Sequence, residues 1–225
     1  MKYNSLLIFL LLSFMSACTQ KYQDLTSTIK DTALSFQDVK QSQQKIKSLP
    51  YASSYVKIDN AAQVFMVLAL AEPSALDSHQ TLLKWLSSDS GMIVTENGRL
   101  VKTLKLPTDN LNSVTSIKGA DPLLLNGKKP DMYSWQARYD WQPNYRFNYT
   151  ANLTWEFMET RKLHTVSWDK ETNYYREKVS IPSLNTSFTN YFWLDKKSNK
   201  VVKSIQFLGP DMPTIEMTIL KPFSG

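Results

Sequence analysis

Aromatic side chains alternate along one stretch of the sequence and suggest a sugar-binding surface. Tyr133, Trp135, Tyr139 and Trp141 all occupy odd positions, and alternate residues of an extended strand point to the same face of a sheet. If that face is open, sugar rings can stack on it, and Arg138 can reach their hydroxyls. If the face is closed, the same rings form the core, and the large area that each aromatic buries favours this alternative. The candidate glycan-contacting residues are therefore Trp135, Arg138, Tyr139 and Trp141.

Residues typical of metal or nucleophilic catalysis are few. His79 and His164 are the only two histidines, and the sequence has no paired cysteines, His-Glu-x-x-His motif or calcium loop. The Gly-x-Ser-x-Gly turn of serine hydrolases is also absent. We therefore expect no metal and no other cofactor.

Paired carboxylates are the remaining catalytic possibility, because a glycosidase needs two of them about 5–10 Å apart. Acidic residues near a tryptophan include Glu156 and Glu159, near Trp155, and Asp169 and Glu171, after Trp168. Residues 169–173 are typical of a hairpin turn, and alternating glutamates on a strand usually lie on a solvated face. No catalytic site assembles from these residues, so the expectation is a protein that is not an enzyme.

The N-terminus carries the pattern of a bacterial lipoprotein signal. Lys2 is followed by an apolar run, Leu6–Met15, which is too short for a membrane span of about 20 residues. Two small residues then precede Cys18, the only cysteine in the chain. This arrangement matches the lipobox, in which the peptide bond before the cysteine is cut and the thiol is acylated.

These features predict a signal peptide over residues 1–17, lipid attachment with palmitate at Cys18, and a polar tether over residues 18–24. Residues 25–225 then form a single domain, which is long enough to bury a core. The formal net charge of +6 comes from scattered Lys and Arg, so nucleic-acid binding is not expected. A mild positive charge is instead compatible with an anionic membrane surface or an acidic polysaccharide.

A helix is expected directly after the tether. Apolar residues at helical spacing predict it from about residue 24 to residue 36; they are Leu25, Ile29, Ala33 and Phe36. A further turn or two of helix is predicted over Val39–Lys47, ended by Pro50 because the residue before a proline leaves the helical region.

From Tyr51 onward the composition is that of an all-β domain, rich in Tyr, Val, Ile, Thr, Phe and Trp. The predicted strands are 51–58, 63–72, 82–86, 92–95, 99–106, 114–118, 132–141, 145–160, 162–168, 174–181, 186–194, 200–208 and 214–220. Residues 107–130 are predicted to be mostly a long loop, of the kind that often carries function.

Two hairpin turns have specific chemistry. Asn97-Gly98 is the strongest hairpin signal because both residues of a type I′ turn need positive φ. This turn sets Glu96 opposite Arg99, where the two charges are predicted to attract. In the turn over residues 195–199, Asn199 is predicted to take the left-handed conformation.

The predicted fold is mostly β: a curved antiparallel sheet or open β-barrel, with an N-terminal α-helix packed on it or closing one mouth.

Several blocks of the sequence together resemble a known family. The blocks are Leu49–Tyr55, Trp85–Asp89, Thr95–Thr103, Asp121–Leu123, Phe192–Asp195 and Ile215–Pro222. They are similar to the YjbF/GfcB family of lipoproteins, found with group-four capsule and exopolysaccharide genes of Gram-negative bacteria. The resemblance runs from the lipobox nearly to the C-terminus.

The resemblance implies a lipid-anchored, periplasm-facing protein that takes part in production or export of a surface polysaccharide. Its implied partners are a β-barrel outer-membrane export protein, the exopolysaccharide and soluble periplasmic proteins. It implies no catalytic residues. Because Thr19 rather than Asp follows Cys18, the family's sorting signal implies the outer membrane.

The expected function is therefore that of a non-enzymatic accessory of exopolysaccharide or capsule production or export. Two alternatives remain open. A deep apolar cavity under the helix would favour a carrier or chaperone for a lipid or lipoprotein acyl chain. Two inward carboxylates facing each other in a cleft would favour a polysaccharide-modifying hydrolase.

Overall fold

A computed structural model describes residues 38–75, 77–107, 109–142 and 146–224 of the protein. Its elements are α3 (Gln43–Ser48), β1 (Ser53–Ile58), β2 (Val64–Pro73), β3 (Thr81–Leu86), β4 (Met92–Glu96), β5 (Arg99–Leu104), β6 (Leu111–Lys118), β7 (Met132–Trp141), β8 (Arg146–His164), β9 (Asp169–Ile181), the 3-10 turn η2 (Pro182–Leu184), β10 (Thr186–Asp195), β11 (Val201–Phe207) and β12 (Thr214–Lys221). The predicted signal peptide, Cys18, the tether and the helix over 24–36 lie outside the described residues.

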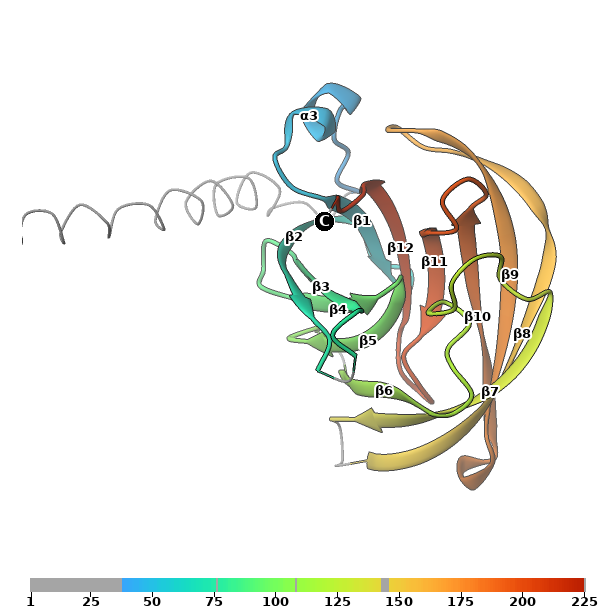
Figure 1. Cartoon of the computed structure of the whole chain (residues 1–225). Helices are drawn as coiled ribbons and strands as arrows, with labels where there is room; N and C mark the ends of the chain where they lie inside the picture. The colour runs from blue at the N-terminus through green and yellow to red at the C-terminus, as the bar shows by residue number, and fades with distance from the viewer. Residues whose placement is uncertain (1–37, 76, 108, 143–145, 225) are drawn as a thin grey trace, which may run out of the picture.

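All twelve strands form one antiparallel sheet that curves almost into a barrel (Figure 1). The strand order is β5-β4-β3-β2-β1-β12-β11-β10-β9-β8-β7-β6, so the two edge strands are consecutive in the sequence. These edges meet where the Leu111 N–H donates to the Thr103 hydroxyl, at 2.9 Å. The prediction of a mostly β protein with a curved sheet or open barrel is confirmed.

The β4–β5 hairpin turns at the predicted position. Asn97 and Gly98 have φ of 47° and 93°, and Glu96 pairs with Arg99 in the strand register. Gly98 is also required for close packing, because a Cβ there would overlap the side chain of Val201 on β11. The buried Gln206 amide donates to the Gly98 carbonyl at 2.9 Å. The hairpin therefore lies against β11 and ties the first half of the sheet to the second.

A large apolar core fills the inside of the curved sheet. It takes inward residues from both halves of the chain, including Val56, Met66, Ile93, Trp135, Tyr139, Trp141, Leu153, Val179 and Ile215. A second buried cluster joins Leu123, from the β6–β7 connection, to Trp155, Tyr175, Phe192 and Leu194. The β6–β7 connection crosses in front of β9 and β10 in Figure 1, so this long loop is packed rather than free.

The β8–β9 hairpin differs from the prediction. One strand, β8, runs to His164 without the expected break, and Asp169–Thr172 belong to β9 instead of forming the turn. The turn lies over residues 165–168, where the Thr165 hydroxyl accepts from the backbone N–H groups of Ser167 and Trp168 at 3.2 and 3.0 Å. The threonine hydroxyl thus provides the turn chemistry at 165–168, four positions before the charged residues 169–173 that had predicted it.

The short helix α3 packs on the outer face of the sheet. Ser42 caps it by accepting from the Lys45 N–H at 3.2 Å, and it ends before Pro50 as predicted. Ile46 and Leu49 pack against Phe65, Val67 and Leu220. Among the described residues, no helix is long and apolar enough to cross a membrane.

Candidate functional site

The predicted glycan-contacting residues do not form a surface. Trp135, Tyr139 and Trp141 are only 3%, 2% and 0% exposed, and the Trp141 indole N–H donates to the Leu208 carbonyl at 2.7 Å inside the barrel. Arg138 is exposed on the opposite face of β7. Of the two alternatives that the aromatic alternation left open, the structure has the closed face, and the sugar-binding candidate must be sought elsewhere.

Arg99 lies opposite Glu96 in the strand register as predicted, but its ion pairs among the described residues are with other carboxylates. Its guanidinium points inward and forms two-pronged pairs with Glu177 on β9, at 2.8 and 2.9 Å, and with Asp121 in the β6–β7 connection. Burial alone would lower the pKa of Arg99, but Asp121 and Glu177 raise it well above its ordinary value. The arginine therefore stays charged in the interior.

These buried charges are fully engaged. Glu177 also accepts from Asn190 at 3.1 Å and from the Trp135 indole at 3.3 Å, and Asp121 accepts from the Leu123 N–H at 2.9 Å. Asp121 and Glu177 are the inward carboxylates that a hydrolase would require, yet they are 4% and 0% exposed and both bind Arg99. Their arrangement holds the β6–β7 connection over the sheet and leaves no accessible acid pair.

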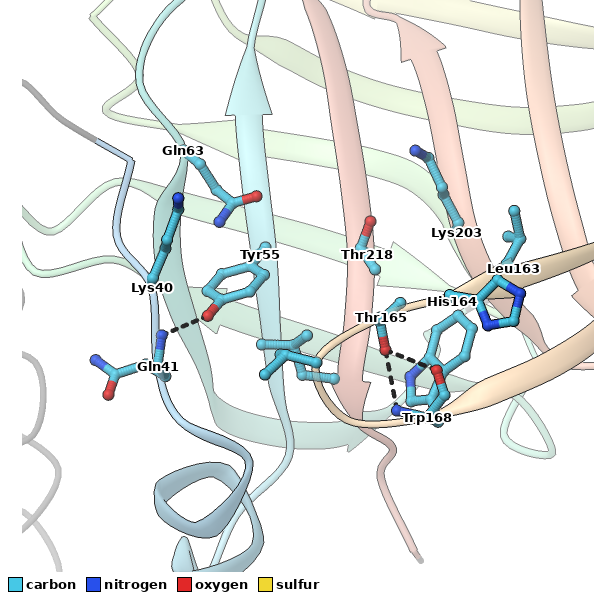
Figure 2. Close-up of a pocket in the computed structure, with 12 residues that line it drawn as sticks. Lys40, Gln41, Tyr55, Gln63, Leu163, His164, Thr165, Trp168, Lys203 and Thr218 are labelled. Carbon is cyan, nitrogen blue, oxygen red and sulfur yellow. Dashed lines mark hydrogen bonds between the residues drawn. The ribbon is translucent and has the colours of Figure 1, made fainter.

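An open groove lies on the outer face of the sheet, between the N-terminal segment before α3 and the tip of the β8–β9 hairpin (Figure 2). It encloses about 380 Å³. Lys40, Gln41 and Gln63 line one side, and residues 163–166 with Trp168 line the other. Two segments far apart in the sequence thus form the two walls.

The floor of the groove is a row of directly paired residues on three neighbouring strands. Tyr55 on β1 pairs with Thr218 on β12, and Thr218 pairs with Lys203 on β11. The Tyr55 hydroxyl accepts from the Gln41 N–H at 2.6 Å, which fixes the N-terminal wall to the floor. Burial raises the pKa of Tyr55, and the Gln41 hydrogen bond opposes this only in part, so the phenol stays neutral.

The opposite wall is fixed by Trp168. Its indole N–H donates to the Ile219 carbonyl of β12 at 2.7 Å, and this bond holds the hairpin tip over the sheet. His164, also in this wall, pairs with Asp169 at 2.8 Å, and both side chains are exposed. Val166 at the tip is 42% exposed. The groove therefore has a firmly held aromatic side and an apolar rim.

The groove lining combines aromatic, amide and cationic side chains. Its lining contains two aromatic rings, two glutamine amides, two lysines and a histidine, and none of the described lining residues is Asp or Glu. Within the described part of the chain, no group of three or more His, Cys, Asp or Glu could hold a metal ion. The groove offers hydrogen-bond donors, aromatic surface and positive charge.

Sequence reasoning missed this groove because its residues come from six separated segments of the chain. Trp168 ends a predicted strand directly before the predicted turn over 169–173, and Tyr55 lies within the first predicted strand. The available signal was a tryptophan at a hairpin tip, where no core residue is needed.

A second cavity of about 370 Å³ lies near the β1–β2 and β3–β4 turns. Its lining is largely apolar and includes Val56, Ile58, Met66, Ile93 and Leu106, with Asp59, Asp89 and Lys105 among its polar residues. The predicted alternative of an acyl-chain carrier would use an apolar space of this kind, but the helix predicted to cover it, over 24–36, lies outside the described residues.

Comparison with known proteins identifies the family. A model of the family described as "Group 4 capsule polysaccharide lipoprotein gfcB, YjbF" matches residues 22–220. The chain belongs to this YjbF/GfcB family. The predicted resemblance is confirmed, and with it the assignment to a family of capsule-associated lipoproteins.

Relatives of known sequence and structure agree with this family. The chain is 32% identical to the lipoprotein GfcB of Escherichia coli K12 over 210 residues, covering 93% of this chain and 94% of that protein. It is 31% identical to the Escherichia coli K12 lipoprotein YjbF over 222 residues, covering 98% of each. The crystal structure of the hypothetical lipoprotein YmcC from Escherichia coli K12 has a TM-score of 0.75 at 29% identity, over 93% of this chain and 98% of that one. The YjbF/GfcB fold is therefore shared along nearly the whole length.

Proposed function

We propose that this protein is a non-enzymatic accessory of capsule or exopolysaccharide production or export, anchored in the outer membrane and facing the periplasm. In this proposal it contacts the polymer through the outer-face groove. The observation that carries the proposal is an open groove of aromatic, amide and cationic side chains in a member of a capsule polysaccharide lipoprotein family.

Anchoring through Cys18 would keep the groove near the membrane. Lys40, at the groove wall, follows Cys18 by 22 residues, and a fully extended chain of that length reaches at most about 75 Å. A polymer contacted there would lie within reach of an export protein in the same membrane. The β-barrel export protein is accordingly the proposed protein partner.

Replacing Cys18 with serine is expected to abolish lipid attachment. Serine has no thiol to acylate, so the variant should lose labelling by a palmitate analogue and leave the membrane fraction. The measurement is metabolic labelling followed by separation of inner membrane, outer membrane and soluble fractions. Continued labelling of the Cys18→Ser variant, or recovery of the unaltered lipoprotein from the inner membrane, would contradict this anchoring.

Filling the groove is expected to weaken polymer binding. Thr218 lies at the centre of the floor, half-buried on an outward strand position where an aromatic residue is compatible with β structure. Thr218→Trp in the full lipoprotein should reduce binding of the organism's purified surface polysaccharide by about tenfold or more, measured by surface plasmon resonance.

The matched control is Thr115→Trp on β6. Thr115 is also half-buried on a strand and pairs with the outward Arg138, far along the strand order from the groove. This variant should bind the polymer normally. If neither the original protein nor the control binds the polymer, the proposed polymer contact is wrong. If the original protein binds the export barrel but not the polymer, it is instead a structural subunit of the export machinery.

The largely apolar second cavity favours a second candidate function, the carrier of an acyl chain. Met66→Trp would fill that cavity. The carrier would be supported if a fluorescent fatty acid bound the original protein but not this variant. Unchanged fatty-acid binding in that variant would exclude this cavity as the acyl site.

A further inference from the structure

The groove floor continues as a longer row across the outer face of the sheet. Beyond Lys203 the directly paired residues are Trp193 on β10, Tyr174 on β9 and Glu159 on β8. From Tyr55 to Tyr174 the row crosses four strand intervals, or roughly 19 Å at about 4.8 Å each. That length suits an oligosaccharide stretch rather than a single sugar.

Aromatic rings stack along the far part of this row. The Tyr174 and Trp193 rings stack with centroids 4.8 Å apart, and Tyr174 also stacks with Tyr191 at 6.0 Å. Tyr174 and Tyr191 are half-buried, so each retains exposed ring surface on the outside of the sheet. An outward aromatic ladder is unusual, because large rings are normally placed in the core.

Cations flank the row at intervals. Lys203 lines the groove and lies 5.5 Å from the Trp193 ring centroid, and Arg161 lies 4.5 Å from the Tyr174 ring centroid. Lys203 is also 2.6 Å from Glu216, and Arg161 pairs with Glu159. These pairs are partly or largely exposed, so they are weak and open to exchange with other carboxylates.

Trp193 adds an independent observation. It is 7% exposed, and its indole N–H has no hydrogen-bond acceptor among the described residues. Buried donors are normally satisfied. The flexible Lys203 side chain lies over this ring, so a lysine that turns toward a bound carboxylate would uncover an indole donor for a neighbouring hydroxyl.

We propose that the groove and this outer row together bind an acidic glycan, a chain of sugars that carry carboxylates. Lys40 and Lys203 pair with carboxylates in the groove, Arg161 pairs with one at the far end, and Tyr174 and Tyr191 support the sugar rings between them. The inference rests on the proposed polymer contact and names the class of polymer and its path. Glu216 and Glu159 are displaced from their cations as the polymer's carboxylates bind.

The test uses defined probes and the full lipoprotein in detergent. The probes are an α-galacturonate hexamer, the matching dimer, and the carboxyl-reduced neutral hexamer, measured by isothermal titration calorimetry at two salt concentrations. The acidic hexamer should bind about tenfold or more tightly than the other two, and its affinity should fall with salt because exposed charges are screened. Lys40→Gln with Lys203→Gln should weaken the acidic hexamer about tenfold and leave the neutral hexamer unchanged.

Position is tested by two further variants. Arg161→Gln should weaken the acidic hexamer about threefold without affecting the dimer. The matched control for Lys40→Gln with Lys203→Gln is Lys102→Gln with Lys118→Gln. It also removes two positive charges, but from β5 and β6 at the two edges of the strand order. This control should bind the acidic hexamer like the original protein.

The outcomes separate this inference from the proposed function. Two results overturn the acidic-glycan assignment even if the native polysaccharide still binds. One is equal affinity for the acidic and neutral hexamers. The other is a loss of affinity for the acidic hexamer in the Lys102→Gln, Lys118→Gln control as large as that in the Lys40→Gln, Lys203→Gln variant. Equal affinity for dimer and hexamer overturns the extension along β10 and β9. If the native polysaccharide fails to bind at all, the proposed polymer contact fails first, and the inference falls with it.

Discussion

Replacing Arg99 with methionine is expected to lower the free energy of unfolding by about 3–5 kcal/mol. Methionine roughly preserves the side-chain length but leaves Asp121 and Glu177 buried without their shared cation. The cost of an uncompensated buried charge greatly exceeds that of a lost surface pair. Urea unfolding followed by tryptophan fluorescence measures the difference.

Arg161→Met is the matched control for this change. Arg161 pairs with Glu159, but their side chains are 48% and 51% exposed, so water solvates either partner alone. The control should cost about 1 kcal/mol or less. Adding Asp121→Asn and Glu177→Gln to Arg99→Met should recover part of the lost stability, since the uncompensated charges are then removed. An Arg99→Met protein as stable as the control would mean that the buried network carries little energy.

Replacing Trp141 with alanine is the second large effect, with an expected loss of about 3–5 kcal/mol. Trp141 is fully buried, stacks on Tyr139 with ring centroids 5.7 Å apart, and donates to the Leu208 carbonyl. Its removal leaves a cavity and an unsatisfied carbonyl together. Thermal or urea unfolding measures the loss, and polysaccharide binding of the folded variant should stay unchanged because the groove lies on the other face.

Two substitutions separate the contributions at Trp141. Trp141→Phe keeps most of the ring but loses the N–H, and should cost about 1–3 kcal/mol. Phe147→Ala removes an aromatic of β8 that is 50% exposed and should change stability by less than about 1 kcal/mol. If Trp141→Ala weakened polymer binding while leaving stability unchanged, that result would falsify the placement of Trp141 in the core.

The stability predictions and the binding predictions concern opposite faces of one sheet. Inward residues such as Arg99 and Trp141 hold the two halves of the chain together, while outward residues such as Thr218 and Lys203 leave room for a ligand. A change on one face should therefore leave the property of the other largely intact. This separation lets each experiment report on folding or on binding alone.

Local sequence patterns are enough to predict the class of fold and most strand positions, since strand alternation and turn chemistry depend on neighbouring residues. The Asn97-Gly98 turn has the positive φ that its residue types predict. Asn199, in the turn over residues 195–199, also has the predicted left-handed conformation, with φ of 54°. The sequence also determined the family, which the chain-wide match bears out. The β8–β9 turn lies a few residues before its predicted position because the Thr165 hydroxyl accepts from two backbone N–H groups of the turn.

Only the tertiary structure decided which face of each strand is buried and which distant residues meet. The alternation of aromatic residues places Trp135, Tyr139 and Trp141 on one face of the strand. It does not predict whether that face is open, because burial depends on how the whole sheet curves. Register correctly put Glu96 opposite Arg99, yet Arg99 pairs with Asp121 and Glu177 from other parts of the chain. The outer groove likewise exists only because one hairpin tip is bonded over β12, a contact between residues far apart in sequence that no local pattern encodes.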